Sequence, residues 1–394
     1  MITAIPWTFL AFTGVVGGII YLHFYFAHNR WRQVRGQETE DIDPSYIRRE
    51  DYFGQSFRTK LQSWLELPAV TSSDGVRTIQ KSSERIRVIP ALRLADRAQS
   101  DDILSIQSDF SCGAAGNFTR EIYAAGNVSV GAGSKLQAVA ADGDITLSPE
   151  VEVARWVDSL GELRLGRNCM IHSRATARKS AFLDVGVQAL SVFAPEITTA
   201  PGAMDASRYA ASSPDRLQIP PVAGADASAL SRMGLDLSKL TPLGPECWIY
   251  AGSWRPEAPV HLTAQLVVRG DCSIPASSLL EQDLKASGNL YIGAGSECKG
   301  NVVSEKSIGL GPGIHFAGII HADGEILLSN GVHGESSVGP VAVDAGSWLY
   351  VEQGVTVRGK LSSGERVRVI APTSAQAWRR KHQPAVRPKS GAAK

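Results

Sequence analysis

Residues 288–334, GNLYIGAGSECKGNVVSEKSIGLGPGIHFAGIIHADGEILLSNGVHG, contain a repeat that decides the fold. Gly295, Gly313 and Gly331 follow one another at intervals of eighteen residues. A second series has the same step and consists of Gly270, Gly288 and Gly324, with Lys306 in the remaining slot. A regular internal period of this length is typical of a solenoid, in which similar coils stack on one another.

A finer period of six residues lies inside the repeat. Apolar residues occupy the first and third positions of each unit, which is the alternation of a strand with one buried face. Three units then make one triangular turn, and successive turns stack about 4.8 Å apart. We predict a parallel, three-faced β-helix with an apolar interior and glycines at its corners. The predicted core residues are Ile292, Val302, Ile308, Leu310, Ile314, Phe316, Ile320, Ile326 and Leu328.

The same pattern occurs further upstream. GNVSVGAGSKL (126–136) closely resembles GNLYIGAGSEC (288–298). We therefore expect a first β-helical block over 104–197 and a second over 246–370. Between them, 198–245 is rich in Ala, Pro and Ser, which predicts a linker or insertion.

The start of the chain predicts a membrane anchor. Residues 4–26 contain no Asp, Glu, Lys or Arg, and as a helix they would span roughly 34 Å, enough for a bilayer core. A cleaved signal peptide is the alternative, but it would need a basic start and a cleavage site of small residues. Arg30, Arg32 and Arg35 follow the apolar stretch, so the positive-inside rule predicts a single-pass protein with its bulk in the cytoplasm. Within the span, Gly14 and Gly18 form a G-x-x-x-G motif for helix packing.

The segments that flank the blocks carry their own expectations. The anchor and its basic flank are assigned to 1–35, and a connecting region to 36–103. Apolar residues at helical spacing predict an amphipathic helix over 44–67, which would either cap the end of the β-helix or lie on a membrane surface. The basic, Pro-containing segment 371–394 is expected to be a disordered tail.

Composition excludes some partners and cofactors. The net charge is only +1, so no general attraction to nucleic acid is expected. None of the five cysteines forms a C-x-x-C pair, which favours buried thiols over a disulfide or metal framework. No cofactor is expected, because the glycine-rich stretches recur at the coil period and lack the helix that a phosphate loop needs.

One column of side chains has metal-binding chemistry. Glu297, His315 and His333 are eighteen residues apart and point outward in three successive coils. Two imidazoles and a carboxylate are possible metal ligands. A solvated polar ladder on the outer face is the favoured interpretation, so neither a metal nor a catalytic residue is assigned.

Two protein families have a β-helical repeat of this kind. Hexapeptide-repeat acyltransferases build a triangular β-helix on the same turn and typically use one catalytic histidine. On that analogy 198–245 would be the loop excursion, and His315, His321 or His333 the base. The alternative function is therefore an acyltransferase that acts on an envelope precursor.

Residues 266–334 resemble the bactofilins, a polymer-forming family of bacterial cytoskeletal proteins. The resemblance lies in G-[DN]-hydrophobic-x-[IV] units, in G-x-G corners and in the restart Lys299-Gly300-Asn301-Val302. It implies a right-handed β-helix that joins end to end into filaments without nucleotide. It also implies a non-enzymatic scaffold at the bacterial inner membrane, whose partners are other copies of itself, the lipid bilayer and cell-envelope proteins. A membrane-tethered adaptor that does not polymerise remains an alternative.

Overall fold

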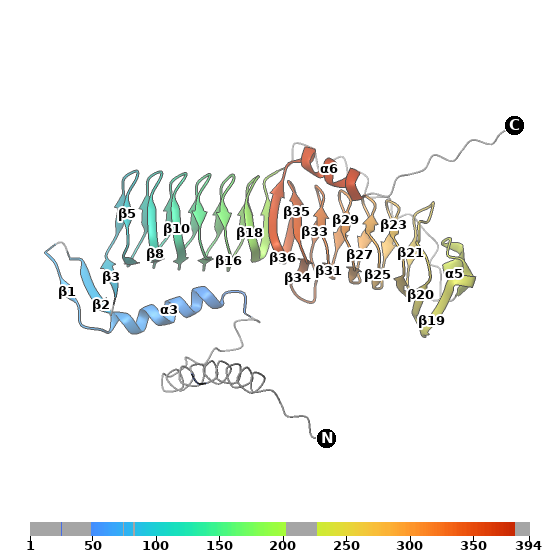
Figure 1. Cartoon of the computed structure of the whole chain (residues 1–394), viewed down its shortest axis with the longest axis horizontal. Coiled ribbons are helices and arrows are strands. Elements are labelled where there is room, and N and C mark those ends of the chain that lie inside the picture. Colours follow the sequence, from blue (N-terminus) through green and yellow to red (C-terminus); the bar gives the residue numbers. More distant parts are fainter. Residues whose placement is uncertain (1–24, 26–48, 74, 82, 202–226, 383–394) are drawn as a thin grey trace, which may run out of the picture. The chain divides into compact units, whose positions relative to one another are not determined.

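The computed structural model describes residues 25, 49–73, 75–81, 83–201 and 227–382 (Figure 1). The chain divides into two compact units, Met1–Tyr52 and Phe53–Lys394. In the described part of the first unit, Arg49 Nε lies 3.4 Å from Asp51 Oδ1. The second unit contains a β-solenoid of about 14 turns with about 18 residues per turn. The expected β-helical architecture is therefore present.

The fold class expected from the sequence was nevertheless wrong in its helical part, which paired the β-helix with a transmembrane helix. Within the described ranges, no helix is long and apolar enough to cross a membrane. The longest is α3 (Tyr52–Leu65), whose 14 residues span only about 21 Å. Apart from Tyr25, the expected span 4–26, with Gly14 and Gly18, lies outside the described residues. The corrected fold class is mostly β, a β-solenoid accompanied by short helices.

The solenoid has three faces, which we name A, B and C, and each face continues through both blocks. Face A contains β3 (Glu84–Ile89), β6 (Ile103–Ile106), β13 (Val157–Ser159), β16 (Arg174–Ala177), β20 (Cys247–Tyr250), β22 (Gln265–Val268), β25 (Leu284–Ala286), β28 (Val302–Ser304), β31 (Ile319–Ala322) and β34 (Val341–Ala345). Face B contains β4 (Leu92–Leu94), β7 (Phe110–Cys112), β9 (Val128–Val130), β11 (Ile145–Leu147), β14 (Leu163–Leu165), β17 (Ala181–Leu183), β21 (His261–Leu262), β24 (Leu279–Leu280), β27 (Glu297–Cys298), β30 (His315–Phe316) and β33 (His333–Gly334). Face C contains β5 (Gln99–Ser100), β12 (Glu152–Val153), β15 (Met170–Ile171), β23 (Cys272–Ile274), β26 (Leu290–Ile292), β29 (Ile308–Leu310), β32 (Ile326–Leu328) and β35 (Trp348–Glu352).

Four longer strands bend around corners and belong to more than one face. They are β8 (Asn117–Ala124), β10 (Lys135–Ala141), β18 (Gln188–Thr199) and β36 (Thr356–Ile370). The first two join faces C and A, and the last two take part in all three faces.

Side chains at the corners complete the backbone hydrogen bonding. Asp109 Oδ1 accepts from Asn127 N at 2.7 Å, and Asn127 Oδ1 accepts from Asp144 N at 2.8 Å. Asp144 Oδ1 then accepts from Glu162 N, also at 2.8 Å. Each carboxylate or amide thus satisfies an N–H group of the next coil, which would otherwise lack a partner at the bend. Corner glycines Gly295 and Gly313 both have φ of +66°, a conformation that other residues adopt only with strain.

The interior is mostly apolar, with buried serines such as Ser278 and Ser296 at a few inward positions. The nine residues expected to form the core are all buried, each at most 2% exposed. Cys112, Cys169, Cys272 and Cys298 are also buried and free, while Cys247 is half-buried. Burial raises the pKa of the Cys298 thiol to about 12, which keeps it protonated and unreactive.

The two blocks join through their last strands. Strand β18 ends the first block and pairs antiparallel with β36, which ends the second, from Gln188↔Arg368 to Thr198↔Thr356. In Figure 1 these two strands lie side by side between the two stacks. The C-terminal ends of the blocks therefore meet in the middle, and each block presents its N-terminal coil at its other end.

Hairpins begin both blocks. Strands β1 (Val70–Thr71) and β2 (Arg77–Lys81) lead antiparallel into β3. At the other end, β19 (Leu240–Gly244) pairs antiparallel with β20, and α5 (Ala227–Arg232) and a 3-10 helix (Leu237–Lys239) precede it. Residues 202–226, the centre of the expected linker, lie outside the described residues.

Candidate functional site

Helix α3 covers the outer side of face A in the first block. Its buried residues Phe57, Leu61 and Trp64 belong to a cluster with outward-pointing residues of the solenoid, including Trp156 and Ile103. The rings of Phe57 and Trp156 lie 5.6 Å apart. The amphipathic helix expected over 44–67 therefore packs on a side of the solenoid, not on its end as a cap, because this face carries an apolar strip of its own.

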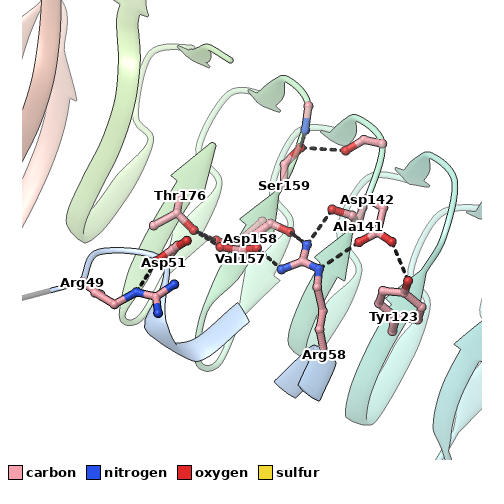
Figure 2. A network of polar contacts seen from close by, with 12 residues as sticks. Arg49, Asp51, Arg58, Tyr123, Ala141, Asp142, Val157, Asp158, Ser159 and Thr176 are labelled. Atoms are coloured by element: carbon pink, nitrogen blue, oxygen red, sulfur yellow. Dashed lines mark hydrogen bonds and ion pairs between the residues drawn. The ribbon is translucent and has the colours of Figure 1, made fainter. Parts of the chain in front are cut away.

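A buried ion pair fixes α3 to this face (Figure 2). Arg58 contacts the carboxylate of Asp158, and their side chains are only 11% and 4% exposed. Arg58 also donates to Asp142 Oδ1 at 2.8 Å and to the carbonyl oxygen of Ala141 at 2.7 Å. Burial alone would lower the pKa of the Arg58 guanidinium, but the two carboxylates outweigh it and the pKa lies above its ordinary value. The arginine is therefore a permanent cation held by two adjacent coils.

The neighbours of this pair complete its hydrogen bonding. Thr176 donates its hydroxyl to Asp158 Oδ2 at 2.5 Å, and Tyr123 donates to Asp142 Oδ2 at 2.6 Å (Figure 2). Burial, helped by Asp142, raises the pKa of Tyr123 to about 12. At Gly54 a Cβ atom would lie 2.1 Å from Asp158 Cγ, so only glycine allows the helix to approach this closely.

Helix α6 (Pro372–His382) has the corresponding role in the second block, on face C. The expectation of a disordered tail from 371 onward was therefore wrong as far as His382, and 383–394 lie outside the described residues. Trp378 lies on Gly309, where a Cβ atom would be 3.0 Å from the indole, and donates Nε1–H to Glu325 at 2.6 Å. A glycine in an outward position thus provides the notch that receives the indole.

A second buried ion pair holds α6. Arg379 donates to Glu352 Oε1 at 2.5 Å, and the Glu352 side chain is 3% exposed. Burial raises the pKa of Glu352, although the Asn330 N–H and Arg379 both oppose this shift. Each block is thus covered on one face by a helix with a buried tryptophan and a buried arginine–carboxylate pair.

Face B is covered by neither helix in the part of the chain that the structure describes. Strand pairing places its outward residues in one row, which runs from Ser111, Ser129, Thr146 and Arg164 through Phe182 and Thr198 in the first block to Thr356, His333, His315 and Glu297 in the second. Within this stretch the row is polar except at Phe182.

The predicted column of Glu297, His315 and His333 lies on this face. Glu297 pairs in register with His315, and His315 with His333. The three residues line a cavity of about 210 Å³ together with Lys299 and Glu335. Among the described residues no three His, Cys, Asp or Glu side chains converge as a metal site. His321, the other candidate base, lies on face A, with Nδ1 3.1 Å from Asp344 Oδ2.

Sequence reasoning missed the two arginine–carboxylate pairs. Asp158 and Glu352 are ordinary polar residues of strands, and only the helices that pack over them make them buried. A buried role for Arg58 had one visible signal, because Arg58 lies three residues before Leu61 and seven before Leu65, spacings that share one face of a helix.

The chain matches no protein-family model, and neither a curated protein nor a solved structure is significantly similar to it.

Proposed function

We propose that this chain is a non-enzymatic scaffold of the bactofilin type. It assembles through the ends of its β-solenoid and organises cell-envelope or polysaccharide machinery at a bacterial membrane. Its partners are other copies of the chain and envelope proteins.

The observation that carries this proposal is the pairing of β18 with β36. Two solenoid ends in one chain already associate through backbone hydrogen bonds and continue all three faces. A β-solenoid also fits the hexapeptide-repeat proteins, so the fold alone does not choose between a scaffold and an acyltransferase. The end-to-end junction favours the scaffold, because it is the kind of contact that filament growth requires.

The remaining ends carry unpaired strand edges. Strands β4 and β21 each pair with one neighbour only among the described strands. In β21, the carbonyl oxygens of Val260 and Leu262 accept from β24, so the N–H and C=O of His261 point to the open edge. By the same alternation, Arg93 points to the open edge of β4. Such edges are templates for pairing with another chain.

Proline at these two positions is expected to block assembly. The double variant Arg93→Pro/His261→Pro removes one backbone donor from each open edge and leaves the backbone hydrogen bonds within the solenoid intact, although it also removes the contact of His261 with Glu281. Each lost hydrogen bond costs about 0.5–1.5 kcal/mol, and the proline ring adds a clash, so the protein concentration needed for assembly should rise at least about tenfold. Sedimentation velocity over a concentration series measures this.

The matched control is Arg93→Ala/His261→Ala, which changes the same side chains but keeps both N–H groups and should assemble like the unmodified chain. Equal assembly of the proline variant would show that the ends are not the contact. If the unmodified chain remains a monomer at every concentration, the proposal that it is a self-assembling scaffold is contradicted.

The location at the bacterial inner membrane, with the bulk of the chain in the cytoplasm, belongs to the same proposal. It is supported by the last turn of α6, where Arg380 is exposed while Arg379, Lys381 and His382 contact the carboxylates of Glu352 or Glu325. The exposed Arg380 suits an anionic lipid surface. Flotation of the full chain with anionic and with neutral vesicles tests whether it binds the membrane surface. Equal flotation with both kinds of vesicle would contradict electrostatic attraction to anionic lipid.

A further inference from the structure

We propose that His315 and His333 on face B bind one late transition-metal ion, with Zn²⁺ as the representative case. This site is independent of the scaffold proposal, since it needs neither assembly nor a partner. It takes a divalent ion that prefers imidazole nitrogen, and it leaves the other coordination positions to water or to a carboxylate.

The geometry of the two rings carries the inference. Parallel pairing places the residues opposite each other in adjacent coils, and their ring centroids lie 5.4 Å apart with the planes at 49°. Two imidazoles bound to one tetrahedral ion, with Zn–N bonds of about 2.0–2.1 Å, have centroids about 5 Å apart. The separation of the two rings is therefore close to the one that a single ion requires.

The surroundings of His333 match those of a metal ligand. Its Nε2 lies 2.9 Å from Glu335 Oε2, and Glu335 is in turn contacted by Arg358. A histidine that binds a metal typically donates its other ring N–H to a carboxylate, which fixes the ring and its tautomer. Glu335 would thus orient His333 with Nδ1 free for the ion.

The cavity leaves room for the ion and its remaining ligands. His315 is exposed, its ring lies beside that of His333, and among the described residues the His315 ring has no hydrogen-bond partner. Glu297, one coil away in register, lines the same cavity of about 210 Å³. Lys299 also lines it, but its Nζ is drawn to Glu281 Oε1 at 3.3 Å. Because only two imidazoles converge, the site is open and exchangeable, unlike a closed structural zinc site.

Isothermal titration of the full chain with ZnCl₂ in a buffer that does not bind metals tests the site. We expect one ion per chain for this site, and His315→Ala and His333→Ala should each lower its affinity at least tenfold. His321→Ala is the matched control, because it removes a half-buried histidine from face A, and it should leave the affinity unchanged. Mg²⁺, which prefers oxygen ligands, should not bind here.

Glu335 is a positioning residue and has its own test. Glu335→Gln keeps the shape of the side chain but weakens its hold on His333, and loss of such a partner typically lowers metal affinity about 10–100-fold. The imidazole resonances of His315 and His333 in NMR spectra should shift on adding Zn²⁺ in the unmodified chain. Absence of binding up to millimolar Zn²⁺, or equal losses in His321→Ala and His315→Ala, would overturn the proposal.

Discussion

Arg58→Ala is expected to destabilise the first block by about 3–5 kcal/mol, the usual cost of removing one partner from a buried ion pair. The cost arises because Asp158 would remain in a site where it is only 4% exposed, with the hydroxyl of Thr176 as its remaining partner. Helix α3 would lose the polar contacts that Arg58 makes with two coils at once, since Arg58 also binds Asp142 and the Ala141 carbonyl.

Hydrogen exchange over residues 53–65, together with urea unfolding, measures this effect. Protection of α3 should fall in Arg58→Ala, while the coils of the second block keep theirs. Arg164→Ala is the control, because its pair with Glu162 is 60% and 40% exposed and should contribute only about 0–1 kcal/mol. The double variant Arg58→Met/Asp158→Leu should recover most of the loss, since apolar replacement of both partners is often neutral. Equal stability of Arg58→Ala and Arg164→Ala would show that the pair does not hold the helix.

Gly359→Val is expected to disrupt the junction between the blocks. Gly359 has a φ of +149° and lies in β36 between Ala194 of β18 and Val341 of β34. A Cβ atom there would lie 2.0 Å from the Val341 carbonyl oxygen, which is backbone and cannot move aside cheaply. The unfavourable φ costs roughly 1–2 kcal/mol, and overpacking costs roughly 1–3 kcal/mol more.

The matched control is Gly339→Val, at an exposed glycine where an added Cβ atom would meet nothing within 4 Å. Thermal unfolding compares the two variants, and hydrogen exchange locates the damage. Loss of protection in β18 and β36 only in Gly359→Val is the expected result. If both variants have the same unfolding temperature, the close approach of the backbone at Gly359 does not contribute to stability.

The β-helical coil was predictable because apolar residues and glycines recur in the sequence with the period of one turn. The apolar residues of the second block recur every six positions, as at Ile308, Ile314 and Ile320, with interruptions at Ser278 and Ser296. This spacing predicts short strands that each bury one face. The column Glu297–His315–His333 followed from the same arithmetic and lies in register in the structure.

The packing of α3 and α6 on the solenoid and the junction between the blocks were not predictable from the sequence, because they depend on residues that point outward from the coils. Trp156 lies outside the inward phase, and nothing in the period indicates that it meets Phe57 of α3. The basic segment around Trp378 has the composition of a solvated tail, yet the notch at Gly309 and the buried Glu352 order it as a helix. An eighteen-residue repeat also does not encode how two blocks meet, so the antiparallel pairing of β18 with β36 appeared only in the structure.

Negative-stain electron microscopy of the purified full chain, without nucleotide and across a series of salt concentrations, tests the central claim most directly. The account predicts filaments or sheets that persist without nucleotide and that the Arg93→Pro/His261→Pro variant does not form. Discrete particles at every salt concentration, from the unmodified chain as well as from the variant, would contradict assembly through the solenoid ends.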